Sequence, residues 1–123
     1  MISQEIRDQV SYYETSLNFD RNQIYFIVDS DKAAKLALIL SEQLNCLGTI
    51  DFSNKHWTEK LKIAKDNLLK WSVMIDGATL RDKSVMIYDL ILKEEFPVKI
   101  TEVQHFFKYP SDFYSKLLED FNV

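Results

Sequence analysis

The hydrophobic pattern changes its period along the chain. Residues 2–17 carry apolar side chains at steps of three and four, which predicts an amphipathic helix. The stripe consists of Ile2, Ile6, Val10, Tyr13 and Leu17. Residues 24–28 are instead apolar at every position and rich in β-formers, which is typical of a strand buried on both faces. We therefore expect this strand at the centre of a sheet.

A second helix and strand follow directly. Asp29, Ser30 and Asp31 supply N-cap chemistry for a helix from about Lys32 to Leu44. Gly48 then leads into a short strand over residues 49–52. A helix between two strands predicts a parallel pair joined by a right-handed crossover.

The next apolar stripe indicates a helix that Asn54 caps. Its members share an arc of about 80° at helical spacing, which directs both tryptophans to the core. They are Trp57, Leu61, Ala64, Leu68 and Trp71.

The last third of the chain reads as strands and a closing helix. Strands over 73–76 and 84–92 are predicted to join across Asp76 and Gly77, with the glycine in the positive φ of a tight turn. A hairpin through 93–96 leads to a strand over 98–107, and Ser111 caps a final helix.

The predicted order is therefore α-β-α-β-α-β-β-β-α. It indicates an α+β fold in one compact domain, residues 1–123, with a mixed sheet of about five strands. The sheet starts with a parallel β-α-β unit and ends in antiparallel hairpins, and the helices pack on it.

Composition excludes several classes of protein. The chain has two glycines, too few for phosphate-cradling loops, dinucleotide turns or nucleophile elbows. With two histidines and Cys46 as the one cysteine, no recognised zinc spacing is present. No apolar run approaches the ~18 residues of a membrane span, and the amino terminus lacks a signal-peptide pattern. We expect a soluble cytoplasmic protein with no cofactor, no catalytic residues and no membrane contact.

The net charge of −4 is unevenly distributed. Residues 1–31 hold six acids and two bases, residues 32–74 four acids and seven bases, and residues 75–123 nine acids and six bases. The only candidate basic face for nucleic acid lies on one helix, with Lys60, Lys62, Lys65 and Lys70. Glu59 and Asp66 interrupt these lysines, so we interpret them as a solvated face and expect no nucleic-acid partner.

Two polar clusters follow predicted strands. Asp29 and Asp31 resemble the Asp-x-Asp motif of haloacid-dehalogenase-like phosphatases, in which two carboxylates hold magnesium and one attacks phosphorus. Lys32 and Ala33 depart from that motif, so helix capping is the preferred interpretation and a metal site the alternative. Asp51, Ser53 and His56 have the residue types of a catalytic triad, yet helix capping by Ser53 and Asn54 explains that cluster better.

The predicted partner-binding surface is acidic and aromatic. On the first helix Glu5, Asp8 and Tyr12 lie opposite the apolar stripe, which suits recognition of a basic protein. Acids in the predicted hairpin loops extend this surface: Asp76, Asp82, Glu94 and Glu95.

In size, acidity and missing catalytic motifs the chain resembles bacterial immunity proteins, which neutralise a toxin. This resemblance predicts a non-enzymatic inhibitor of a basic toxin or nuclease domain, as a monomer or weak dimer. The alternatives are a small metal-dependent phosphohydrolase using Asp29 and Asp31, and a regulatory subunit of a larger assembly.

Overall fold

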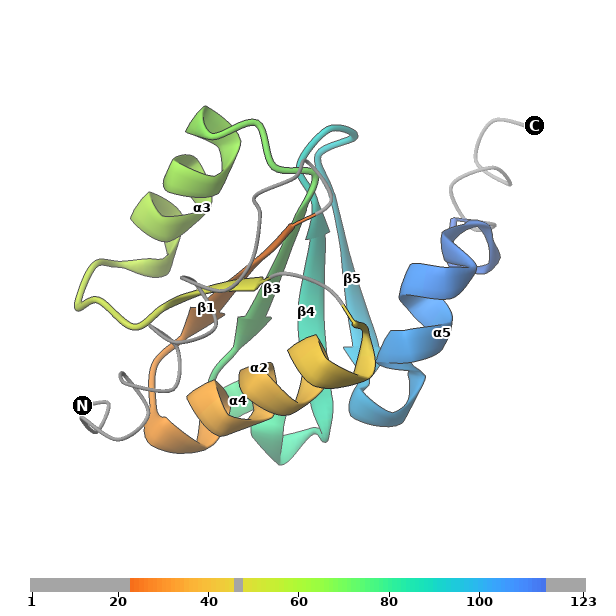
Figure 1. The fold of residues 1–123 in the computed structure, drawn as a ribbon, viewed down its shortest axis with the longest axis horizontal. Coiled ribbons are helices and arrows are strands. Elements are labelled where there is room, and N and C mark those ends of the chain that lie inside the picture. Colours follow the sequence, from red (N-terminus) through yellow and green to blue (C-terminus); the bar gives the residue numbers. More distant parts are fainter. Residues whose placement is uncertain (1–22, 46–47, 115–123) are drawn as a thin grey trace.

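A computed structural model describes residues 23–45 and 48–114, which form a five-stranded mixed sheet and its helices (Figure 1). The strands are β1 (Ile24–Val28), β2 (Gly48–Asp51), β3 (Trp71–Ile75), β4 (Ser84–Asp89) and β5 (Glu94–Lys99). The helices are α2 (Asp31–Gln43), α3 (Trp57–Asp66), α4 (Gly77–Arg81) and α5 (Val103–Lys108), with 3₁₀ turns η1 (Ile100–Glu102) and η2 (Pro110–Asp112). The helix expected over 2–17 and Cys46 lie outside the described residues.

The sheet confirms the predicted fold class and the central strand. Its order is β2-β1-β3-β4-β5, with β1 parallel to both of its neighbours and β4 antiparallel to β3 and β5. Phe26 of β1 stands opposite Ile50 on one side and Val73 on the other. All five residues of β1 are buried, as their unbroken apolar run predicted.

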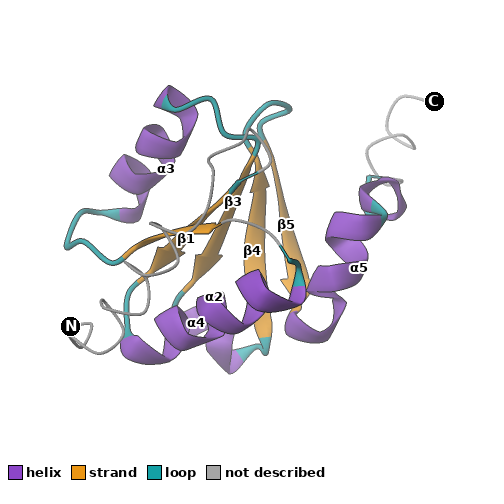
Figure 2. Ribbon diagram, viewed as in Figure 1, coloured by secondary structure: helices purple, strands orange, loops and turns teal. Residues whose placement is uncertain are grey.

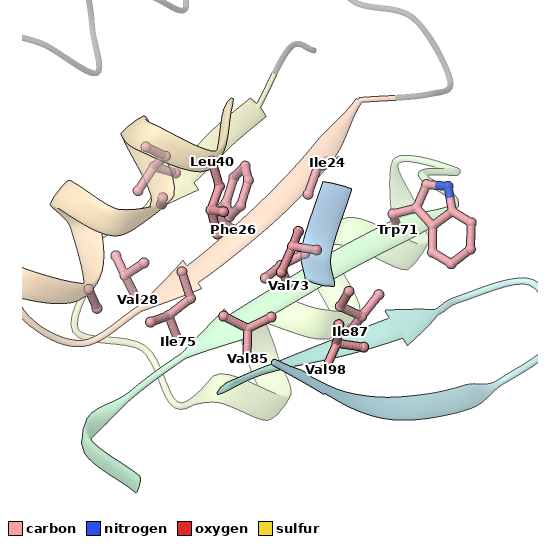
Figure 3. Close-up of a cluster of buried hydrophobic side chains, with 14 of the residues drawn as sticks. Ile24, Phe26, Val28, Leu40, Trp71, Val73, Ile75, Val85, Ile87 and Val98 are labelled. Carbon is pink, nitrogen blue, oxygen red and sulfur yellow. The ribbon is translucent and has the colours of Figure 1, made fainter. Parts of the chain in front are cut away.

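Helices cover both faces of the sheet (Figure 2). The crossover through α2 runs from β1 outward to β2, and the crossover through α3 runs from β2 back past β1 to β3. Because these two crossovers run in opposite directions across the sheet, right-handed connections place α2 and α3 on opposite faces. On the α2 face, Phe26, Val73 and Ile87 belong to the larger core cluster, which also includes Phe106 of α5 (Figure 3 shows most of its strand residues). On the α3 face, Tyr25 and Ile27 pack with Leu61 and Ala64.

The Trp57–Trp71 stripe is not one helix, contrary to the prediction. Helix α3 ends at Asp66 with Asn67 as its C-cap, and Leu68 follows with φ of 59° and 85 % of its surface exposed. Trp71 is buried, but on β3, where it pairs with Ile24 and Asp89. The N-cap is His56 rather than Asn54. In the sequence, the helical spacing of apolar residues continues beyond the residue at which α3 ends. Prediction from this spacing alone therefore misplaced both tryptophans.

The predicted strand over 98–107 is also wrong beyond Lys99. Lys99 pairs with Ser84, the first residue of β4, so later residues have no partner strand. The chain therefore turns into η1 and α5, which places His105 on a helix. Ser111 does not cap a closing helix as predicted: it lies inside η2, whose N-cap is Tyr109 and which has no side-chain cap hydrogen bond. Most of the predicted closing helix lies outside the described residues.

Neither glycine adopts the conformation expected of a tight turn. No glycine has positive φ; Gly77 is the first residue of α4, which Asp76 caps. Gly48 is needed for space, because a Cβ there would lie 2.6 Å from Cε2 of Phe26. Within the described ranges, none of the helices has the length and apolar character needed to cross a bilayer.

Candidate functional site

Three helices begin close to the carboxyl ends of the parallel strands, at one edge of the sheet. Strands β1, β2 and β3 end at Val28, Asp51 and Ile75, and α2, α3 and α4 begin shortly after them. Helices α2 and α3 then run back over opposite faces. In open α/β sheets, the crevice outside such strand ends is where ligands bind. We call this region the carboxyl edge.

One polar side chain after each of these three strands caps the helix that follows. The Ser30 hydroxyl accepts from the Ala33 amide at 3.2 Å, and Nδ1 of His56 accepts from the Thr58 amide at 3.3 Å. Asp76 forms a capping box with Thr79, in which both bonds are 2.9 Å long. The predicted capping at Asp29–Asp31 is thus confirmed at Ser30. Among the residues that the structure describes, no three His, Cys, Asp or Glu side chains are grouped to hold a metal ion.

A buried lysine joins the ends of β1 and β2. The Lys60 ammonium donates to the carbonyl oxygens of Val28 at 3.1 Å and Asp51 at 3.2 Å, and it lies 3.9 Å from Oδ1 of Asp51. Lys60 is 4 % exposed, so its charge is not available to a ligand. Because Lys60 belongs to α3, these bonds fix the first turns of α3 against the carboxyl edge.

Asp51 is the anionic centre of this cluster. Its other oxygen accepts from the Tyr25 hydroxyl, and Oδ1 accepts from the Ser53 amide at 2.9 Å. Burial raises the pKa of the Asp51 carboxyl, but hydrogen bonds from Ser53 and Tyr25 and the charge of Lys60 outweigh it, so the pKa lies below its ordinary value. The carboxylate is therefore ionised at neutral pH. Asp51, Ser53 and His56, which have the residue types of a catalytic triad, have structural roles here.

An exposed tryptophan stands beside this cluster. Trp57 lies on the same helical stripe as Leu61 and Ala64, but in the first turn of α3, near the strand ends that Lys60 contacts. Its side chain is 42 % exposed, and its ring centroid is 5.7 Å from that of His56. Sequence reasoning missed this residue because the stripe predicts burial, whereas the first turn extends beyond the sheet that would cover it.

Helix α3 separates its exposed charges into two stripes. At about 100° per residue, Lys62 and Lys65 fall within about 60° of each other, and Glu59 and Asp66 occupy the adjoining arc. All four side chains are exposed, as is Lys55 just before the helix. The acids lie between the lysines in the sequence but beside them on the helix surface, so Lys62 and Lys65 form a separate basic stripe.

A half-buried tyrosine extends the α3 face of the sheet. Tyr88 of β4 packs against the cluster of Tyr25 and Leu61, and it stands opposite Glu95. Burial, together with the charges of Glu95 and Asp76, raises the pKa of its phenol. The hydroxyl therefore keeps its proton at neutral pH and can donate a hydrogen bond.

A pocket of about 450 Å³ lies elsewhere, between the end of α2 and α5. It is lined by Gln43, Leu44, Gln104, His105, Phe107 and Lys108. The His105 ring is 2.8 Å from Asp112, and the Gln104 amide donates to the Gln43 carbonyl at 3.0 Å. The carboxyl terminus of α2 carries the partial negative charge of the helix dipole, which disfavours an anion here. The pocket is therefore a poorer site for phosphate than the surface of α3.

The predicted partner-binding acids lie at several places. Glu5, Asp8 and Tyr12 are outside the described residues. Asp76 caps α4 at the carboxyl edge, and Asp82 is the exposed C-cap of the same helix. Glu94 and Glu95 start β5 at the opposite edge, since Glu94 pairs with Asp89 and Asp89 with Trp71. The structure thus does not bring the loop acids together, and their role in binding stays a prediction.

Comparison with known proteins finds likeness of structure only. No family model matches the chain, and no curated protein matches it. The RNA binding domain of threonyl-tRNA synthetase from Cryptosporidium parvum Iowa II has a TM-score of 0.61 at 16% identity, over 75% of this chain and 24% of that one. Histidyl-tRNA synthetase from Nostoc sp. PCC 7120 has a TM-score of 0.65 at 16% identity, over 85% and 27%. Prolyl-tRNA synthetase from Cryptosporidium parvum has a TM-score of 0.64 at 14% identity, over 81% and 23%.

These likenesses correct the functional prediction. The chain spans about a quarter of the length of each of these synthetases, and the identities show a shared fold alone. All three are tRNA synthetases, and one of the matched structures is an RNA binding domain. The immunity-type toxin inhibitor, its basic toxin or nuclease partner and the exclusion of nucleic acid were therefore wrong. They rested on composition and missing motifs, which do not determine a fold.

Proposed function

We propose that this chain is an RNA-binding module that takes a single-stranded loop of a tRNA or a similar folded RNA at the carboxyl edge. The observation that carries the proposal is the exposed Trp57 ring, set by α3 beside the strand ends and next to a basic stripe. The fold supports it, since the RNA binding domain of a threonyl-tRNA synthetase shares this fold.

Trp57 provides the stacking surface in this proposal. Proteins that read RNA loops stack splayed bases on exposed aromatic rings, and a stacked base contributes about 1–3 kcal/mol. The ring lies against His56 and is followed in α3 by Lys60, whose buried bonds hold the helix start in place. A ring fixed in this way loses little freedom when a base stacks on it.

Lys62 and Lys65 provide contacts to phosphate, with Lys55 nearby in the loop before α3. Their exposed ammonium groups lie on the helix that carries Trp57, so a strand stacked on the ring can pass along them. The chain as a whole carries −4, which limits non-specific attraction to RNA. Affinity should therefore depend on this local stripe and fall steeply as salt rises.

We further propose that the module has no catalytic activity of its own and acts in the cytoplasm, where tRNA is found. Supporting this, three polar side chains at the carboxyl edge, Ser30, His56 and Asp76, are engaged in helix capping. The Asp51 carboxylate is likewise occupied by Tyr25, Ser53 and Lys60.

The test is a fluorescence-anisotropy titration of a labelled RNA hairpin with a single-stranded loop, alongside a fully paired duplex of equal length. Trp57→Ala should weaken hairpin binding about 5- to 150-fold, the equivalent of one lost stack. Tyr109→Ala is the matched control, because Tyr109 is 50 % exposed but follows α5, away from α3. It should leave the dissociation constant unchanged.

The lysines are tested by the salt dependence of the same titration. Replacing both Lys62 and Lys65 by alanine should lower the slope of log affinity against log salt by about 1.4, the value for two released counterions on a single strand. Lys35→Ala on α2 and Lys99→Ala on β5 remove charges that are also exposed but lie elsewhere, and they should leave the slope unchanged. No binding of the hairpin at low salt, or equal effects of Trp57→Ala and Tyr109→Ala, would refute the proposal.

A further inference from the structure

Two loops at the amino ends of the parallel strands present large aliphatic side chains to solvent. One loop joins α3 to β3 and carries Leu68, which is 85 % exposed. The other joins β4 to β5 and carries Ile91 and Leu92, which are 67 % and 58 % exposed. The Leu90 amide donates to the Lys70 carbonyl at 2.8 Å, so the two loops are joined (Figure 1). We call Leu68, Ile91 and Leu92 the amino-edge patch.

A buried carboxylate holds the loop between β4 and β5 in place. Asp89, only 2 % exposed, accepts hydrogen bonds from the amides of Ile91 and Leu92 at 3.0 Å, and its other oxygen accepts from the Tyr114 hydroxyl. The two exposed side chains are therefore presented by a loop of defined conformation. Such a preorganised surface loses little conformational entropy when it packs against a partner.

Leu68 gains little from packing within its own chain, since most of its side chain is in water. Its φ of 59° lies in the left-handed region, which asparagine and glycine adopt at lower cost than leucine. Contact with a partner would remove this apolar surface from water. The amino-edge patch as a whole therefore has the character of a contact surface.

The charges around the patch are segregated between its two sides. Residues 65–70 carry two lysines and one aspartate, whereas residues 89–95 carry three acids and one lysine. We call these ranges the basic side and the acidic side. The basic side leads into β3, and the acidic side continues from β4 into β5, the next strand outward. The charged residues are Lys65, Asp66 and Lys70 on the basic side and Asp89, Lys93, Glu94 and Glu95 on the acidic side.

This arrangement is complementary to itself. In a two-fold contact, one side of the patch on each copy meets the other side of the patch on its partner. The basic side of each copy then faces the acidic side of the other, and the apolar residues meet between them. A strongly basic or a strongly acidic partner would be repelled by one of the two sides. The charges therefore favour a second copy of this chain.

We propose that the amino-edge patch is the contact surface of a symmetric homodimer, in which Leu68 of each copy packs on Ile91 and Leu92 of the other. The proposal goes beyond RNA binding, because the patch lies at the sheet edge opposite Trp57. Both carboxyl edges stay open in such a dimer.

Sedimentation velocity of the full chain without RNA, over about a hundredfold range of concentration, tests the proposal. The unaltered chain should change from monomer to dimer as its concentration rises. Leu68→Asn should raise the dissociation constant of the dimer at least about tenfold, because each dimer loses two buried leucines. The same substitution should leave the free energy of unfolding of the monomer unchanged or higher, since asparagine tolerates the positive φ. Ile39→Asn is the control: Ile39 is 51 % exposed on α2, and its loss should not change the dissociation constant.

Charge reversal tests the two-fold arrangement. Lys65→Glu with Lys70→Glu, or Glu94→Lys with Glu95→Lys, sets like charges against each other and should weaken the dimer at least about tenfold in each variant. An equimolar mixture of the two variants should associate again, because an acidic side then meets a basic side at both contacts. Restored association also shows that both variants are folded.

Lys32→Glu with Lys35→Glu is the matched control for charge. Both lysines are exposed on α2, and their reversal changes the net charge as much as reversal of the basic side does, so it should leave the dimer intact. A chain that stays monomeric at every concentration would overturn the proposal, as would a dimer that Leu68→Asn does not weaken. Failure of the mixed variants to associate would overturn the pairing of unlike sides. Because no RNA is present, none of these results depends on the role of Trp57.

Discussion

Adding a single methyl group at each of the two glycines should change stability in opposite directions. A Cβ on Gly48 would lie 2.6 Å and 2.9 Å from Cε2 and Cδ2 of Phe26 and 2.9 Å from Oγ of Ser41. A Cβ on Gly77 would meet no atom within 4 Å. Phe26 is fully buried and Ser41 donates to the Ala37 carbonyl, so neither neighbour of Gly48 moves freely.

The expected magnitudes follow from these distances. Overpacking at Gly48 costs about 1–3 kcal/mol, and the reduced entropy of the unfolded chain returns about 0.4–1 kcal/mol of it. Gly48→Ala should therefore lower the free energy of unfolding by about 1–2 kcal/mol. Gly77→Ala lacks the clash and the positive φ, so it should raise that free energy by about 0.4–1 kcal/mol.

Urea unfolding followed by tryptophan fluorescence measures both variants at unchanged m-value. Phe26→Leu provides the internal check, because a smaller side chain packed against Gly48 should reduce the cost of Gly48→Ala in a double-mutant cycle. If Gly48→Ala is as stable as the unaltered chain, or if its cost is the same with and without the Phe26→Leu substitution, the close packing of β2 on β1 is wrong as described.

The Lys60 cluster gives two further predictions. Lys60→Met leaves the Val28 and Asp51 carbonyls without their donor and should lower the free energy of unfolding, measured in urea, by about 1–3 kcal/mol. Lys62→Met, on the exposed side of α3, should change that free energy by no more than about 0.5 kcal/mol. Equal effects of the two substitutions would contradict the buried hydrogen bonds of Lys60. The pKa of the Asp51 carboxyl is lower in the folded chain than in the unfolded one, so its contribution to stability is present above about pH 4 and is lost as the pH falls through the folded value. Asp51→Asn should therefore flatten the acid limb of the stability profile, measured as the urea midpoint between about pH 5 and 2, and parallel profiles would remove Asp51 as a source of that limb.

Local patterns were sufficient where one physical cause dominates. The apolar run of β1 predicted a central strand, because only a strand covered on both faces is apolar at every position. The Asp29–Asp31 cluster predicted a helix start, and Ser30 forms that cap by accepting a hydrogen bond from the amide three residues later in the chain. Neither inference needs any knowledge of distant residues.

Predictions failed where a partner far along the chain decides the structure, and at Gly77, where a local capping box was overlooked. Residues 100–107 are rich enough in β-formers to be a strand, yet β4 begins at Ser84 and offers no partner past Lys99. The hairpin expected at Gly77 became helix α4, because the Asp76 and Thr79 side chains satisfy the first amides of a helix there. Positive φ occurs instead at Asn45, Leu68, Lys83 and Lys93, where no glycine marks it.

The α+β class, the central strand and the parallel start of the sheet could be predicted from the amino-acid sequence alone, because burial and helix capping depend on neighbouring residues. Which side chains meet at the sheet edges depends on the three-dimensional packing of the chain. It buries Lys60, the residue that sequence grouped with the exposed lysines, and leaves Trp57 in solvent although its spacing predicts burial. The reason is that exposure at a helix start depends on where the neighbouring strands end, and that is set by pairing between residues far apart in the chain.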